Sequence, residues 1–186
     1  HQDLPLHAAC MNTTEEAAPI VGLVLEADPS ALLQVGHNDR LPLHEACRTS
    51  GNVETVRSLL AAHPAALAAR TGDEDLPLRL ACTNTTHGAG AIVGLLLEAD
   101  PRAAEEPCAQ GWLPLHNACR NSGSMEVVRS VLTAHPGALT TGTNERSLPL
   151  HMACMNSTAD AAAIVGLVLE ADLSALQQKG RGGFLP

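Results

Sequence analysis

Apolar residues recur along the chain at helical spacing, and polar turns interrupt them at nearly regular intervals. In residues 40–74, the side chains Leu43, Ala46 and Cys47 fall at positions i, i+3 and i+4, which places them on one face of a helix. Pro42 occupies the first helical position, where its fixed φ and missing N–H are tolerated. The pattern predicts a short helix with one apolar face.

A second helix is predicted after the polar break that follows. Asn52 can cap its first turn, and Pro64 ends it. Its apolar face carries Val53, Val56, Leu59 and Leu60. The predicted unit is therefore helix, turn, helix and extended loop.

The first helix is built on the sequence Leu-Pro-Leu-His-x-Ala-Cys, and copies of this sequence divide the chain into repeats. Copies begin at Leu4, Leu41, Leu76, Leu113 and Leu148, with Arg79 replacing the histidine of the third, and Leu185-Pro186 begins another. Their spacing alternates between 37 and 35 residues. The predicted units one to five are residues 1–39, 40–74, 75–111, 112–146 and 147–183, with the start of a sixth at 184–186. A fixed period of this length is typical of one stacked repeat array.

Odd and even units differ, so the full period is a pair of 72 residues. Odd units carry a glycine inside the second helix, at Gly22, Gly94 and Gly166. Glycine there costs about 1 kcal/mol relative to alanine, so we expect a neighbouring backbone to approach closely. In unit five Leu173 replaces the closing proline, which predicts a less sharply defined helix end.

The repeated sequence resembles the Thr-Pro-Leu-His-x-Ala-Ala signature of ankyrin repeats, and the resemblance covers the whole chain. It implies an all-α, helix-turn-helix solenoid in which each unit begins with a β-turn finger. Fingers and first helices would line a concave face that binds another protein. The chain departs from the family where leucine replaces the threonine, whose hydroxyl would brace the turn.

Composition narrows the partners and the compartment. Net charge of −9, from 20 acidic and 11 basic residues, argues against a nucleic-acid partner, which requires clustered Lys and Arg. Apolar runs such as 161–169 are far shorter than the ~20 residues that span a bilayer. Five of the six cysteines share one repeat position, where stacked helices roughly 8–10 Å apart are too distant for disulfides. Reduced thiols indicate the cytoplasm or the nucleus.

Several motifs suggest chemistry that a structural role explains better. His and Cys lie three residues apart in four units, as in His44 and Cys47, but each unit offers two zinc ligands where a structural site needs four. In the ankyrin family that the sequence resembles, this histidine braces the turn and the small residue packs between helices, so we expect these roles here, with no cofactor and no metal. Asn12-Thr-Thr14, Asn84-Thr-Thr86 and Asn156-Ser-Thr158 match the N-glycosylation pattern but lie in turns. No catalytic constellation is visible, so we predict a protein that is not an enzyme.

Acidic residues and histidines alternate at the ends of the second helices. They are Asp28, His63, Asp100, His135 and Asp172. Because a cation is favourable at a helix C-terminus and an anion is not, one hypothesis is an acid and histidine ladder that favours stacking. The alternative is five solvated residues.

The candidate recognition surface consists of first-helix and finger positions that helical phase leaves outside the core. In the even units these are Arg40, Glu45, Arg48, Trp112, Asn117 and Arg120, and in the odd units Ala8, Met11, Leu80, Thr83, Met152 and Met155. Trp and Arg are frequent interface anchors, and Met suits adaptable surfaces. Trp112 is the strongest candidate, although it could instead pack against a neighbouring finger.

The sequence thus predicts a non-catalytic module that binds another protein through the concave face. Two alternatives remain open: a structural spacer or scaffold, and a regulatory segment of a larger enzyme. Neither end of the array carries an evident polar cap, which such arrays need. We therefore expect a longer array or ends that other chains cover.

Overall fold

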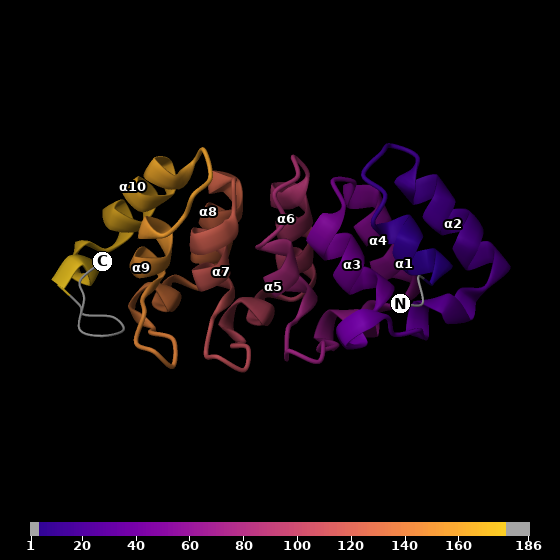
Figure 1. The fold of residues 1–186 in the computed structure, drawn as a ribbon, viewed down its shortest axis with the longest axis horizontal. Coiled ribbons are helices and arrows are strands. Elements are labelled where there is room, and N and C mark those ends of the chain that lie inside the picture. The colour runs from indigo at the N-terminus through magenta and orange to yellow at the C-terminus, as the bar shows by residue number, and fades with distance from the viewer. Residues whose placement is uncertain (1–3, 178–186) are drawn as a thin grey trace.

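The computed structural model describes residues 4–177, and this part of the chain is a row of helix pairs without a β-strand. Figure 1 shows the pairs following one another from the N-terminal to the C-terminal end, with loops along both long edges of the row. The predicted all-α solenoid is confirmed. The start of the sixth unit, at 184–186, lies outside the described residues.

Each predicted unit contributes one short helix and one longer helix. The first helices are α1 (Pro5–Cys10), α3 (Pro42–Thr49), α5 (Pro77–Ala81), α7 (Pro114–Asn121) and α9 (Pro149–Cys154). The second helices are α2 (Ala17–Ala27), α4 (Val53–Ala62), α6 (Ala89–Ala99), α8 (Met125–Ala134) and α10 (Ala161–Ala171). Proline opens every first helix, as the pattern predicts.

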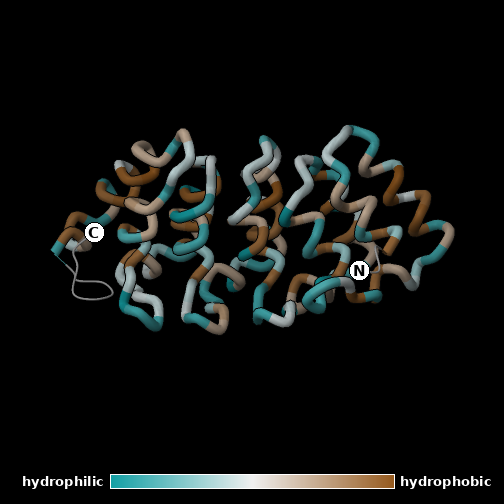
Figure 2. Tube along the Cα trace, in the orientation of Figure 1, coloured by the Kyte–Doolittle hydropathy of each residue, from teal (hydrophilic) through white to brown (hydrophobic). Residues whose placement is uncertain are grey.

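The core lies between the two rows of helices and continues from unit to unit. Each first helix packs on the next first helix, and each second helix on the next second helix. Hydrophobic residues follow the helices and hydrophilic ones collect in the loops (Figure 2). Leu43, Leu78, Leu115 and Leu150 are almost completely buried and belong to one continuous apolar cluster. Because the cluster runs across all units, each unit is stabilised by its neighbours.

The histidines that recur in the repeats brace the start of the first helices from within the core. The backbone N–H of Leu113 donates to His116 Nδ1 at 3.1 Å, and the opposite ring nitrogen, Nε2, lies 3.1 Å from the Ser147 carbonyl of the next finger. His44 makes the same two types of bond, to the Leu41 N–H and the Ala69 carbonyl. These bonds explain why helix, turn and next finger keep a fixed geometry although leucine replaces threonine.

The fingers obtain their missing hydroxyl from another position. Thr71 Oγ1 accepts from the backbone N–H groups of Asp73 and Asp75, and Thr143 Oγ1 accepts from those of Glu145 and Ser147. The tips close through residues with positive φ, among them Glu74 and Gly111. A threonine inside the finger therefore replaces the bracing threonine of the ankyrin signature.

The segment after each second helix is a 3-10 helix, so the prediction of a wholly extended loop is wrong. These short helices are η1 (Pro29–Leu33), η3 (Pro64–Ala68), η4 (Pro101–Glu105), η5 (Pro136–Thr140) and η6 (Leu173–Gln177), while η2 (His37–Asp39) lies in a finger. The closing prolines stand at their first position, where a missing N–H is harmless. Unit five follows the same course although Leu173 replaces proline, so its helix end is as well defined as the others.

The proposed ladder is not formed by ion pairs. The carboxylates of Asp28, Asp100 and Asp172 each accept the backbone N–H two residues later and so cap the following 3-10 helix. Within residues 4–177, no salt bridge joins these carboxylates to His63 or His135. Local capping satisfies each Asp within its own unit, which is why the alternation does not couple the units.

The Asn-x-Ser/Thr segments of units three and five connect neighbouring units. Asn84 Nδ2 donates to the carbonyls of Cys47 and Ser50 in unit two, at 2.9 and 2.8 Å, and Thr86 Oγ1 donates to Ser50. Asn156 and Thr158 make the equivalent bonds to unit four. Asn84 is only 1% exposed, so its amide serves as a buried structural clamp between units.

The glycines inside the second helices do not mark a close approach, and that expectation is wrong. A Cβ added at Gly22, Gly94 or Gly166 would meet no heavy atom within 4 Å. The close approach lies at Gly88 instead, where a Cβ would stand 2.7 Å from the carbonyl carbon of Gly51.

This difference predicts opposite effects for two alanine substitutions. Gly94→Ala should raise the free energy of unfolding by about 0.5–1 kcal/mol, because alanine loses less backbone entropy in a helix and finds open space. Gly88→Ala should lower it, because the added Cβ displaces the unit-two turn. Urea unfolding of both variants tests this, and a destabilised Gly94→Ala would contradict it.

Candidate partner-binding surface

The candidate residues predicted from sequence lie on the first helices and fingers but differ in exposure. Ala8, Met11 and Met155 are exposed, Arg40, Arg48, Thr83, Trp112 and Arg120 are half-buried, and Glu45, Leu80, Asn117 and Met152 are buried. For the last four, the expectation that helical phase leaves them outside the core is wrong. Adjacent first helices pack side by side, so the next unit covers positions that a single helix would expose.

In unit two, three of the candidates form one ion-paired cluster. Glu45 Oε2 accepts from both Nε and Nη2 of Arg48, at 3.0 and 2.7 Å, while Arg40 Nη1 lies 3.4 Å from Glu45 Oε1. Glu45 is 7% exposed, so the two guanidinium groups provide the positive charge that a buried carboxylate requires. This part of the surface is neutralised from within.

Unit three has an ion pair that the sequence reasoning missed. Arg79 Nη1 lies 2.9 Å from Asp75 Oδ2; Arg79 belongs to α5, and Asp75 lies two residues before its first residue. Burial raises the pKa of Asp75, and the adjacent Arg79 charge opposes that shift. The i, i+4 spacing of an acid and an arginine was the available signal, but Arg79 was interpreted only as an interruption of the histidine series.

Unit four brings Trp112 and Arg120 together with the methionines of unit five. The Arg120 guanidinium carbon lies 5.8 Å from the centroid of the Trp112 ring, and Nη1 lies 3.6 Å from Met155 Sδ and 4.0 Å from Met152 Sδ. Trp112 also stacks obliquely over His116, with ring centroids 6.2 Å apart. Trp112 thus packs partly within its own unit and remains half-exposed, beside Met155 at 56% exposure.

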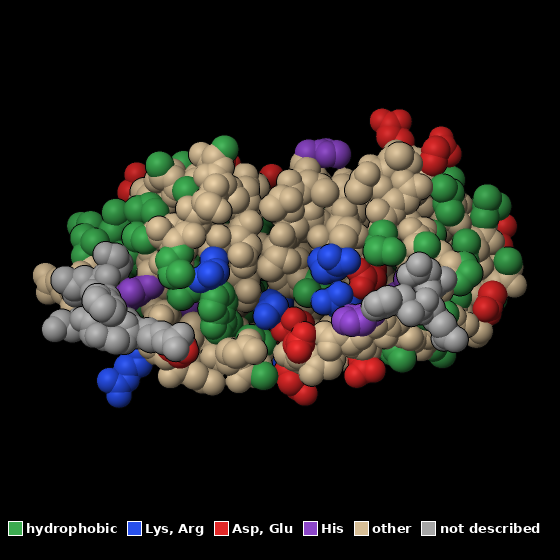
Figure 3. Space-filling view, viewed as in Figure 1, with side chains coloured by type: hydrophobic (Ala, Val, Ile, Leu, Met, Phe, Trp, Pro, Cys, Tyr) green, Lys and Arg blue, Asp and Glu red, His purple; other side chains and the backbone are tan. Residues whose placement is uncertain are grey.

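Charge on this face changes from one end to the other (Figure 3). Basic side chains lie along its middle, and acidic ones accompany them in the N-terminal half. Farther toward the C-terminal end, a basic side chain is bordered by hydrophobic ones. Within residues 4–177, no carboxylate lies within salt-bridge distance of Arg120.

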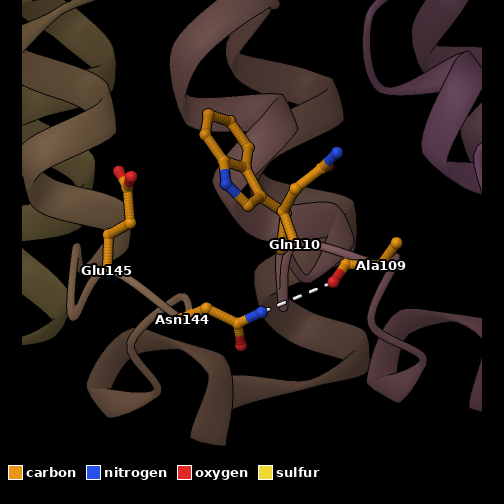
Figure 4. Close-up of a pocket in the computed structure, with 5 residues that line it drawn as sticks. Ala109, Gln110, Asn144 and Glu145 are labelled. Atoms are coloured by element: carbon orange, nitrogen blue, oxygen red, sulfur yellow. Dashed lines mark hydrogen bonds between the residues drawn. The ribbon is translucent and has the colours of Figure 1, made fainter.

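A pocket of about 370 Å³ opens between the finger that precedes α7 and the finger that precedes α9. Ala109, Gln110, Trp112, Asn144 and Glu145 line it. Figure 4 shows the Asn144 amide reaching across to the Ala109 carbonyl, at 3.4 Å, so this hydrogen bond ties the two fingers together. The pocket adjoins the exposed side of Trp112 and combines apolar and polar walls.

The recurring cysteines and histidines are parts of the core. Burial raises the pKa of the Cys10 and Cys82 thiols to about 12, so both are protonated at neutral pH. Among the described residues all six cysteines are free, and no three His, Cys, Asp or Glu side chains are grouped to hold a metal ion. The histidine ring nitrogens are instead used in the backbone bonds that brace the turns.

The longest helices of the described part have 11 residues, and none is long and apolar enough to cross a membrane.

Comparison with known families agrees with this architecture. A family model of ankyrin repeats, in three copies, matches residues 43–144. The chain belongs to the ankyrin repeat family. The resemblance expected from the Leu-Pro-Leu-His-x-Ala-Cys copies is therefore confirmed, and ankyrin arrays act generally as protein-interaction modules.

Comparison of the ankyrin array with solved structures supports the same fold. It is similar to one chain in the structure of a complex, that of the Bd0816 predatory endopeptidase from Bdellovibrio bacteriovorus with immunity protein Bd3460. The TM-score is 0.74 and the sequence identity is 16%. The alignment covers 100% of this chain and 89% of that chain. A search of curated proteins found no match.

Proposed function

We propose that this ankyrin array is a non-catalytic module that binds another protein through the face formed by its first helices and fingers. One observation carries the proposal: Trp112, Arg120 and Met155 form a partly exposed aromatic, cationic and apolar cluster next to a pocket. Interface hot spots are enriched in Trp and Arg and lie in well-packed pockets. Nucleic acid and membrane are not expected partners, because the net charge of −9 opposes contact with phosphate groups.

Buried, protonated thiols are consistent with a reducing compartment, so we place the module in the cytoplasm or nucleus. A spacer or scaffold, and a regulatory segment of a larger enzyme, are the alternative functions.

Alanine substitutions distinguish a binding module from a spacer. Trp112→Ala and Arg120→Ala should each weaken partner capture at least tenfold, because truncating a central Trp or Arg removes a large part of an interface's binding energy. The tagged array would be incubated with extract of its native cells, and bound proteins quantified by mass spectrometry.

Arg57→Ala and Arg129→Ala provide matched controls, since both arginines are exposed on second helices, away from the proposed face. Circular dichroism would verify that every variant keeps its helix content. If all four variants capture the same proteins in the same amounts, the binding proposal is wrong and the spacer function is favoured.

A further inference from the structure

Because the sequence repeats in pairs of units, the proposed partner-binding residues of unit four can be compared with the equivalent residues of unit two. Units two and four share the same sequence plan 72 residues apart, so Arg48 corresponds to Arg120, Arg40 to Trp112, and Glu45 to Asn117. The helices involved, α3 and α7, have equal lengths and the same histidine bracing. Differences between the two sites therefore arise from side chains and not from the backbone plan.

In unit two, the Glu45 carboxylate is paired with two arginines. Arg48 donates two hydrogen bonds to one of its oxygens, and Arg40 approaches the other. Charge-assisted bonds of this kind are among the strongest that a protein makes. Unit two thus shows how an anion is bound at this place in the fold.

In unit four the carboxylate is missing, while one of the two arginines that bind it in unit two is retained as Arg120. Asn117 replaces Glu45 and is 3% exposed, and its amide nitrogen Nδ2 is buried without a hydrogen-bond partner. Arg120 contacts only the sulfur atoms of Met152 and Met155 and the Trp112 ring among its described neighbours. Thioethers are weak acceptors, whereas a guanidinium offers five N–H donors.

A buried donor without an acceptor is costly, and a partly desolvated guanidinium favours an anion. Asn117 and Arg120 stand three residues apart on α7, at the positions that Glu45 and Arg48 occupy in unit two. Trp112, Met152 and Met155 border this place with apolar surface. The group that would fit this place is therefore an anion flanked by apolar groups.

We propose that Asn117 and Arg120 form a carboxylate-binding site that recognises an acidic side chain of a partner protein. The inference rests on the proposed binding function and specifies the chemistry of the partner. Because the whole chain carries a charge of −9, long-range attraction cannot recruit a strongly acidic segment. The preferred segment has a single Asp or Glu flanked by apolar residues, one of which enters the pocket between Trp112 and Asn144.

Trp112 is the only tryptophan of the chain, so its fluorescence reports directly on this site. The probes are three peptides: acetyl-Leu-Glu-Leu-amide, its Gln counterpart, and acetyl-Leu-Ala-Leu with a free C-terminal carboxylate. The Glu peptide should titrate Trp112 saturably and bind at least tenfold more tightly than the Gln peptide. Preference for the free C-terminal peptide would instead assign the site to a chain terminus, and so overturn the assignment to a side chain.

The decisive variant is Asn117→Glu, which supplies Arg120 with a carboxylate from its own helix, as Glu45 does for Arg48. It should remain folded, with an unchanged or higher urea midpoint, and lose at least tenfold in affinity for the Glu peptide. Asn121→Glu is the control, since it adds the same charge to α7 at a position adjacent to Arg120, where side chains do not face each other. Equal binding of the Glu and Gln peptides, or unchanged binding by Asn117→Glu, would overturn the proposal.

The same variants separate this inference from the proposed function. If Trp112→Ala loses the cellular partner and Asn117→Glu retains it, the carboxylate site is wrong while the binding module stands. If neither variant loses a partner, the proposed function itself fails.

Discussion

Asn84→Ala is expected to lower the free energy of unfolding by roughly 2 kcal/mol, because it leaves the buried carbonyl of Cys47 without its inter-unit donor. The substitution also removes one of the two donors to the Ser50 carbonyl, which Thr86 continues to bind. Since the bonds join units two and three, their loss should also weaken coupling along the array. Urea unfolding followed by circular dichroism should show a lower midpoint and a broader transition.

Asn12→Ala provides the matched control for this experiment. Asn12 accepts the Thr14 N–H at 2.8 Å, as Asn84 accepts that of Thr86, so the local turn is the same. Within residues 4–177, however, the Asn12 amide has no acceptor in another unit. The difference between the two variants isolates the inter-unit bonds, and equal losses of stability would show that only the turn matters.

Acidification from pH 6.5 toward pH 4 is expected to remove about 3 kcal/mol of stability through His116 alone. Burial lowers the pKa of His116 to about 4, from an ordinary value of 6.5. The folded state therefore favours the neutral ring. The stability that the neutral His116 ring contributes is fully present above pH 6.5. It is lost as the pH falls from 6.5 to about 4, because the unfolded chain takes up the proton first.

The hydrogen bond from the Leu113 N–H acts on the pKa of His116 in the same direction as burial, whereas the Ser147 carbonyl opposes it. His116 Nδ1 accepts the Leu113 N–H, so Nε2 must carry the proton that the Ser147 carbonyl accepts. A second proton on Nδ1 would break the bond to Leu113 and place a charge in the core. His44 has the same bonds, and burial lowers its pKa too, so both histidines contribute in the same direction.

Urea midpoints measured at pH 7.5, 6.5, 5.5 and 4.5 test this prediction. His116→Gln should be less stable at pH 7.5 but should lose less stability on acidification than the unmodified chain. His135→Gln, at a half-buried histidine that forms no cap hydrogen bond, is the control for the substitution itself. Parallel curves for the unmodified chain and His116→Gln would contradict the assigned role of His116.

The spacing of neighbouring residues was sufficient to predict the helices and the repeat positions of the histidines. Proline at the first helical position, the i, i+3, i+4 pattern of Leu43, Ala46 and Cys47, and the copies every 35 or 37 residues are all properties of neighbouring residues. Helix formation depends on such short-range spacing. For that reason the helices and the repeats could be predicted without a structure, while the ankyrin fold and the bracing role of histidine followed from the resemblance to ankyrin repeats.

Exposure of the candidate site could not be predicted in the same way. Helical phase identifies the side that faces the partner helix of the same unit, but it does not show how much the next unit covers. Leu80 and Met152 were expected on the surface and are buried between first helices. Gly94 was expected at a close contact, which occurs at Gly88, because loop paths decide where backbones meet.

The sequence by itself determined the ankyrin array, its odd and even units and the residues that vary around the repeated motif, because these depend on local periodicity. Only the tertiary structure decided what those residues do, since their partners come from units about 35 residues away. It brought Asn84 to the carbonyls of unit two, paired Glu45 with its arginines, and left Asn117 and Arg120 without a carboxylate. Through-space contacts between stacked units carry that information, and no single repeat contains it.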